Sequence, residues 1–143
     1  MRTRTGPLEG WRLLGLLAGA LMAMAVAIWA VGGLDVEATR LVIRATARSS
    51  LLLFLLAFVA SSAVQLWPGE ATRWLLRNRR YFGLAFAFSH GIHAVAIIAL
   101  AAMDQSLFLT LTNTVTLVSG GLAYLFIALM AATSFDSAVR WLG

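Results

Sequence analysis

The run from Tyr81 to Met103 contains no charged residue, and two histidines interrupt its apolar character. A bilayer core of roughly 30 Å needs about 20 apolar residues in a helix, so this run is long enough to cross a membrane. His90 and His93 lie near its middle. Bulk water cannot solvate an imidazole at that depth. Each histidine must therefore form a hydrogen bond within the protein, bind a metal or cofactor, or line a cavity.

The composition predicts an integral membrane protein. Of the 143 residues, 61% are hydrophobic, which exceeds the roughly 45–50% of soluble domains. The net charge of +5 comes from arginines, which lie outside the apolar runs or at their edges, as membrane topology requires. The predicted partner is thus the lipid bilayer, and nucleic-acid binding is not indicated. The chain has no cysteine, so redox chemistry would need a cofactor.

Four apolar runs divide the chain into membrane spans. We predict a single all-α domain over residues 1–143, a bundle of four transmembrane helices that span about 11–31, 41–67, 81–103 and 114–134. The first run could also be a cleavable signal peptide, but its length favours a retained helix. Gly32 and Gly33 end it, and Asp35 and Glu37 begin a short polar link.

The connections between the later spans are polar. Residues 68–80 carry arginines at helical spacing beside Trp74, which predicts a short interfacial helix or loop with an aromatic anchor. Residues 104–114 are expected to form a polar loop. In the fourth span, Gly120 and Gly121 would permit the close approach of a neighbouring helix or of a bulky flat ligand.

Arginine counts predict the orientation. One side of the membrane would hold Arg2, Arg4, Arg12, Arg73, Arg77, Arg79, Arg80 and Arg140, and the other side would hold Arg40, Arg44 and Arg48. Because arginine-rich segments stay in the cytoplasm, both termini should be cytoplasmic. The expected location is a bacterial inner (plasma) membrane, which the chain crosses several times. The three arginines of the second span share one helical face and could extend to the interface.

Helical rise places Arg48 and His93 at a similar depth. Arg48 would lie about 12 Å below the outer end of the second span, and His93 about 15 Å below that of the third. This arrangement would suit a haem, with His93 on the iron and Arg48 near a propionate. His90 and His93 would project about 60° apart on one helix. They cannot both be axial ligands, so another helix or chain must supply the second.

Three segments together resemble the ferric reductase-like transmembrane domain superfamily, and within it the MsrQ-type haem-binding membrane subunits. RRYFGLAFAFSHGIH is similar to an Arg-Arg-x-x-Gly-Leu…Leu-His element, and ATARSSLLLFLLAFVASS to a Thr-Gly-Arg-x-Ala opening with Ala47 in place of Gly. LAYLFIALMAATSFDSAVRWLG resembles a Thr-Ser…Leu-Gly exit. The residues at the motif positions are Arg79, Arg80, Gly83, His93, Arg48, Thr133, Ser134, Leu142 and Gly143.

The resemblance implies a haem b site. His93 would be an axial ligand, His90 would stand outside the motif, and Arg48 with Arg44 would compensate propionate charge. FMN and a quinone are further candidate cofactors. In this family a further helix with counter-ligands follows the Leu-Gly, whereas this chain ends just before it. The expectation is a truncated family member, whose second ligand comes from missing C-terminal helices or a redox partner protein; alternatively, haem binding has been lost.

The expected function is one-electron transfer between a quinol or flavin donor and an acceptor across the membrane. No residue would act as acid, base or nucleophile, so the chain would be an oxidoreductase component only when haem is bound. The alternative is a non-catalytic membrane subunit or assembly protein in which His90 and His93 are structural. A small transporter is disfavoured because the spans contain no carboxylate.

Overall fold

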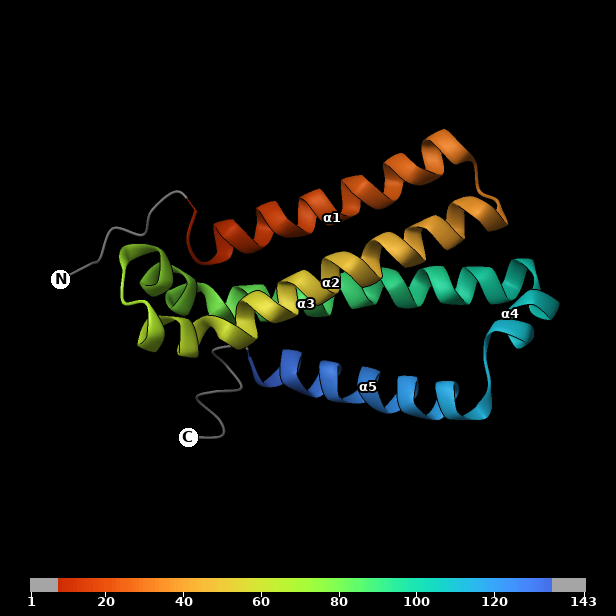
Figure 1. The fold of residues 1–143 in the computed structure, drawn as a ribbon. Coiled ribbons are helices and arrows are strands. Elements are labelled where there is room, and N and C mark those ends of the chain that lie inside the picture. The colour runs from red at the N-terminus through yellow and green to blue at the C-terminus, as the bar shows by residue number, and fades with distance from the viewer. Residues whose placement is uncertain (1–7, 135–143) are drawn as a thin grey trace.

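The computed structural model describes residues 8–134. Within this range the chain is all-helical and contains no strand (Figure 1). Four of the helices are long and apolar enough to cross a membrane, which indicates a multi-pass membrane protein. The helices are α1 (Trp11–Gly32), α2 (Val36–Leu66), α3 (Glu70–Met103), α4 (Gln105–Leu111) and α5 (Thr114–Thr133).

A tight turn joins α1 to α2. The helix α1 ends where predicted, because Gly33 adopts a φ of +83° that favours glycine. A Cβ on Gly32 would lie 2.9 Å from Cβ of Ala38, so the turn leaves no room for a side chain there. Asp35 caps α2 by accepting a 2.7 Å hydrogen bond from the backbone N–H of Ala38. The helix α2 therefore starts at Val36, five residues before the predicted span.

The helix α3 is longer than the span predicted from its apolar run. It starts at Glu70 and continues without a break to Met103. At its start, the backbone N–H of Gly69 donates to the hydroxyl of Thr72 (3.1 Å). The expectation of a separate element at 68–80 is wrong, because no glycine or proline interrupts the chain between Glu70 and the apolar run. A helix of 34 residues measures about 51 Å, so one end projects beyond the hydrocarbon core.

The helices α2 and α3 pack along most of their length and form the centre of the molecule (Figure 1). Small residues in their interface let the backbones approach closely, and α1 adds apolar side chains from one side. The main apolar cluster consists of Leu13, Leu21, Ala25, Val42, Leu53, Phe82, Ala85, Ile92 and Ala96.

The segment before α1 is attached to the beginning of α3. Asn78, almost fully buried, accepts a hydrogen bond from the backbone N–H of Gly10 (2.9 Å). Trp74 donates to the carbonyl of Leu8 (3.0 Å), and Arg77 pairs with Glu9 (3.0 Å). These contacts bring the start of α1 to the start of α3, at the end of the molecule where α5 also ends (Figure 1).

The region expected to be a polar loop contains the short helix α4, so that expectation is wrong. Asp104 caps this helix by accepting hydrogen bonds from the backbone N–H of Leu107 (2.9 Å) and the hydroxyl of Ser106 (2.7 Å). These bonds stabilise the charged carboxylate and hold the pKa of Asp104 below its ordinary value. The cap turns the chain at the end of α3 and directs it towards α5.

The last helix, α5, is attached loosely. None of its residues is buried, and its packing contacts are with α3 (Figure 1). Large apolar side chains are exposed over the whole molecule, including Phe126 on α5, Ile98 on α3 and Phe58 on α2. Such an extensive apolar surface is not tolerated in water. It is consistent with contact between these helices and the lipid bilayer.

Candidate functional site: a histidine-lined cavity between α3 and α5

A cavity of about 410 Å³ lies between α3, α4 and α5. The helix α3 contributes His90 and His93, and α5 contributes Gly120, Gly121 and Tyr124. Cavities of this size commonly hold small molecules or cofactors, with a few polar groups in a mostly apolar wall. The two predicted histidines therefore line one cavity.

His93 bridges α2 and the cavity. Its Nδ1 atom lies 2.9 Å from the hydroxyl of Thr46, a fully buried residue of α2. Because the lining of the cavity comes from α3, α4, α5 and Thr112, the ring edge next to Thr46 faces away from the cavity. The ring of His93 thus has one nitrogen held by the protein.

His90 lies beside His93 without an equivalent partner on another helix. The two imidazole rings are 5.8 Å apart, and the ring of Phe86 is 4.5 Å from that of His90. The Nδ1 atom of His90 is buried and has no hydrogen-bond partner within residues 8–134. The carbonyl of Phe86 lies near enough to interact, but it is outside hydrogen-bond geometry.

Tyr124 is the residue that sequence reasoning missed. Its ring faces His90 edge-on at 5.8 Å, and its hydroxyl is buried without a hydrogen-bond partner in the described part of the chain. Leaving a buried polar group unpaired costs about 1–3 kcal/mol. The signal that could have identified it is its spacing, because Tyr124 follows Gly120 by four residues and so shares its helical face.

The glycines of α5 form an open part of the wall. A Cβ added to Gly120 or Gly121 would meet no atom within 4 Å. The expectation of close approach by a neighbouring helix at these positions is therefore not met within residues 8–134. The remaining alternative, room for a flat ligand, is consistent with their place in the cavity wall.

The arginines predicted to share the site lie elsewhere on α2. Arg48 is exposed and follows Thr46 by two residues, which corresponds to about 200° around the helix. It therefore projects to the side opposite the contact between Thr46 and His93. Arg44 lines a different hollow at the turn between α1 and α2, together with Asp35 and Glu37. The structure brings the two histidines together and brings neither arginine to them.

The arginine pair of the third motif lies near the start of α3. Arg79 donates to the hydroxyl of Ser61 on α2 (2.9 Å), and the guanidinium of Arg80 lies 5.8 Å from the ring centres of Trp11 and Tyr81. Other predicted features, namely Arg2, Arg4, Arg140, Leu142 and Gly143, fall outside the described residues.

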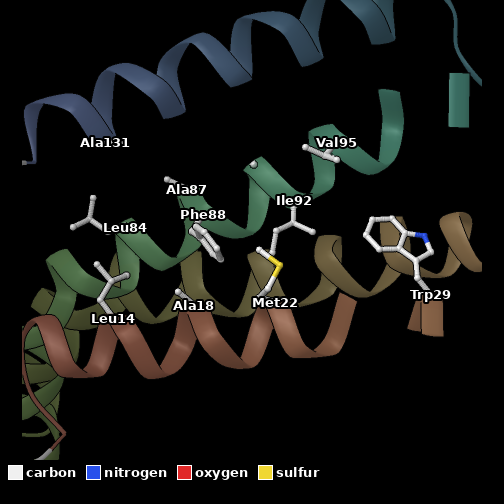
Figure 2. Close-up of a pocket in the computed structure, with 11 residues that line it drawn as sticks. Leu14, Ala18, Met22, Trp29, Leu84, Ala87, Phe88, Ile92, Val95 and Ala131 are labelled. Carbon is white, nitrogen blue, oxygen red and sulfur yellow. The ribbon is translucent and has the colours of Figure 1, made fainter. Parts of the chain in front are cut away.

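A second, larger hollow of about 650 Å³ opens between α1, α3 and α5 (Figure 2). Its walls are almost entirely hydrocarbon, with Leu14 and Met22 from α1 facing Leu84 and Phe88 from α3. The one indole nitrogen in its lining, on Trp29, is engaged with the hydroxyl of Thr39 at 3.3 Å. This hollow can accommodate hydrocarbon and offers no polar chemistry.

The fold and the cavity define the class: an all-helical, multi-pass membrane protein with two histidines on one cavity wall. Comparison of the chain with protein-family models, with curated proteins and with solved structures finds no match. Function must therefore be inferred from the motifs and from the geometry of the cavity.

Proposed function

We propose that this chain is a membrane haem b domain of the ferric reductase-like type, which passes electrons from a quinol or flavin donor to an acceptor across the membrane. The observation that carries the proposal is the cavity in which His90, His93 and the glycines of α5 meet. When bound, the haem would supply one-electron redox chemistry, which no side chain in a cysteine-free chain can easily provide.

The residues of the cavity fit such a group. His93 would hold the haem iron, because its ring is already oriented by Thr46, and metal-bound histidines are usually held in this way by a second residue. Gly120 and Gly121 leave room for a flat macrocycle. The unpaired polar atoms of His90 and Tyr124 would gain partners from a ligand with polar groups. A propionate role for Arg44 and Arg48 is not part of this proposal.

The residues of the chain would contribute binding and exclusion of water. Phe108 and Leu117 line the same cavity, and an apolar wall of this kind lowers the local dielectric and so influences the redox potential of a bound group. No other residue of the chain is assigned to the haem iron. We infer that further helices or a redox partner supply a further ligand, as the resemblance implies.

The decisive experiment is a reduced-minus-oxidised absorption spectrum of the protein purified in detergent. Wild type should show a Soret band, and His93→Ala should lose it. Ser119→Ala, a change on the exposed surface of α5, is the matched control and should bind haem as wild type does. A wild-type protein that shows no Soret band after reconstitution with haem would overturn the proposal.

A second candidate function is a non-catalytic membrane subunit in which His93 is structural. The contact that favours it is the 2.9 Å bond between Thr46 and His93, which joins α2 to α3 without any ligand. The two functions differ in one measurement. If the histidines are structural, His93→Ala lowers the free energy of unfolding of the haem-free protein, and wild type binds no haem.

The orientation is also a proposal. We place both termini in the cytoplasm of a bacterial inner membrane, since Arg12, Arg73, Arg77, Arg79 and Arg80 all lie in the first turns of α1 and α3. Reporter fusions test it: an enzyme active only in the periplasm, inserted between Gln105 and Leu111, should be active. The same reporter inserted at Pro68 should be inactive, and the reverse pattern would refute this orientation.

A further inference from the structure

The hydroxyl of Thr46 has three close neighbours but only one proton. Its Oγ1 atom lies 2.7 Å from the carbonyl oxygen of Val42, 3.1 Å from that of Ile43 and 2.9 Å from Nδ1 of His93. A threonine hydroxyl can donate one hydrogen bond and accept two. The two carbonyl oxygens can only accept. The position of this single proton therefore decides the protonation of His93.

The proton must point to a carbonyl. If Thr46 donated to His93 instead, two oxygens without a hydrogen between them would lie 2.7 Å apart at Val42, which is a repulsive contact. When Thr46 donates to Val42, its lone pairs are free to accept. The contact at 2.9 Å then requires His93 to donate from Nδ1. In a neutral imidazole with hydrogen on Nδ1, Nε2 is unprotonated.

The surrounding hydrogen bonds fix the position of Thr46. The backbone carbonyl of Thr46 accepts a bond from Ser89, one turn before His93 on α3 (3.3 Å). Ser89 in turn accepts a bond from Ser50 on α2 (2.8 Å). All three residues are buried. The register between α2 and α3 is therefore set by buried polar contacts one helical turn from the Thr46–His93 pair.

We propose that Thr46 is a positioning residue that holds His93 as the tautomer protonated on Nδ1, with the unprotonated Nε2 available to a ligand in the cavity. The chemical class of that ligand is an electron-pair acceptor, such as a metal centre. The tautomer follows from the contacts of Thr46, and the backbone carbonyl of Ile43, a group that can only accept, also lies near the ring of His93. The use of this tautomer towards haem rests on the proposed function.

The tautomer can be measured on the haem-free protein. We would label the histidines with ¹⁵N and record spectra at pH 8, above the usual histidine pKa of about 6.5. The signals of His93 are assigned by their absence in His93→Ala. Wild type should show a protonated Nδ1 and an unprotonated Nε2. Thr46→Ser keeps the hydroxyl and should preserve this pattern, whereas Thr46→Val should lose it.

Two results would overturn the inference: a wild-type His93 protonated on Nε2, or a Thr46→Val protein with an unchanged tautomer. If Thr46→Val does not fold, the wild-type and Thr46→Ser spectra still show whether His93 is protonated on Nδ1 or on Nε2. His90, which has no contact with Thr46, serves as the internal reference and should not respond to either substitution.

Haem binding provides a second, separate measurement. Loss of the residue that orients a metal-bound histidine typically weakens metal binding about 10- to 100-fold. Thr46→Val should therefore bind haem that much more weakly, and Thr46→Ser should bind it as wild type does. The reduction potential should rise in Thr46→Val, because an imidazole that loses the hydroxyl acceptor on Nδ1 donates less charge. Absence of haem in wild type refutes the proposed function but leaves the tautomer result standing, so the two failures are distinguishable.

Discussion

The two faces of α3 differ in how completely their polar groups are paired. On the face towards α2, the hydroxyls of Thr46, Ser50 and Ser89 all have hydrogen-bond partners, and all three residues are buried. On the face towards α5, the hydroxyl of Tyr124 and Nδ1 of His90 are buried without partners in the described chain. On the first face every one of these buried hydroxyls is hydrogen-bonded within the protein. The second has the properties of a binding site.

This difference locates the cavity at the boundary between a rigid pair and a loosely held helix. The helices α2 and α3 pack closely through small residues, whereas α5 has no buried residue. The cavity therefore has one closely packed wall, where Thr46 holds His93, and one wall on a helix that has no buried residue. Thr46 on α2 orients His93, and α5 forms the opposite wall of the cavity.

The largest effect is expected at the interface of α2 and α3. Ser89→Leu removes the acceptor of Ser50 and inserts a larger side chain where Ser89 is fully buried. Overpacking and the unpaired hydroxyl should together lower the free energy of unfolding by about 2–4 kcal/mol. Ser119→Leu makes the same replacement on exposed α5 and should change it by less than about 0.5 kcal/mol.

Thermal or denaturant unfolding in detergent, followed by circular dichroism, measures both variants. Equal losses of stability in the two proteins would show that the burial of Ser89 between α2 and α3 does not distinguish it from an exposed serine. The difference between the two changes in the free energy of unfolding is more informative than either change alone, because detergent shifts the stability of both proteins in the same direction.

A smaller effect on stability is expected in the wall of the cavity. A Cβ at Gly120 would meet no atom within 4 Å, and glycine in a helix costs about 1 kcal/mol relative to other residues. Gly120→Leu should therefore change the free energy of unfolding of haem-free protein by at most about 1 kcal/mol. Under the proposed function it should nevertheless abolish most haem binding, because its side chain enters the cavity.

Gly15→Leu on α1 is the matched control, since a Cβ there also meets nothing within 4 Å and Gly15 does not line the cavity. It should retain haem. Binding is read from the Soret absorbance per mole of protein. Full haem occupancy in Gly120→Leu would mean that haem binds outside the cavity between α3 and α5.

Much of the fold could be predicted from hydropathy, because membrane helices are defined by long apolar runs. The errors lie at the helix ends, where capping decides the boundary and hydropathy does not. Asp35 starts α2 early, and Asp104 turns an expected loop into α4. Similarly, α3 continues through 70–80 because arginine and tryptophan are compatible with a helix even though they are not apolar.

For the candidate site, the sequence predicted which residues are unusual but not which face one another. His90 and His93 stood out by depth alone. The pairing of His93 with Arg48 failed as a geometric expectation, because equal depth does not imply a shared face and Thr46 occupies the contact. The spacing of Tyr124 from Gly120 marks a shared helical face, but that this face meets His90 depends on α5 lying against α3. Rotation of helices about their axes is set by packing.

The smallest expected effect concerns the connection between the two faces. Asp104 caps α4, the short helix that leads from α3 to α5, and its pKa lies below the ordinary value of 3.8 because backbone and hydroxyl groups stabilise the carboxylate. A carboxyl group whose pKa is lower in the folded than in the unfolded chain stabilises the fold at pH values above its ordinary, unfolded-state pKa. This contribution is lost as the pH falls through the lower, folded-state value.

Asp104→Asn preserves the cap and removes the titration, because asparagine is an equally good N-cap. Wild type should therefore lose stability relative to Asp104→Asn as the pH falls from about 5 to 2, with a constant difference above pH 5. Unfolding temperatures of both proteins across this range measure the effect. A difference that does not vary with pH would mean that Asp104 titrates alike in the folded and unfolded chains, and that its contacts with Ser106 and Leu107 do not hold α4 in place.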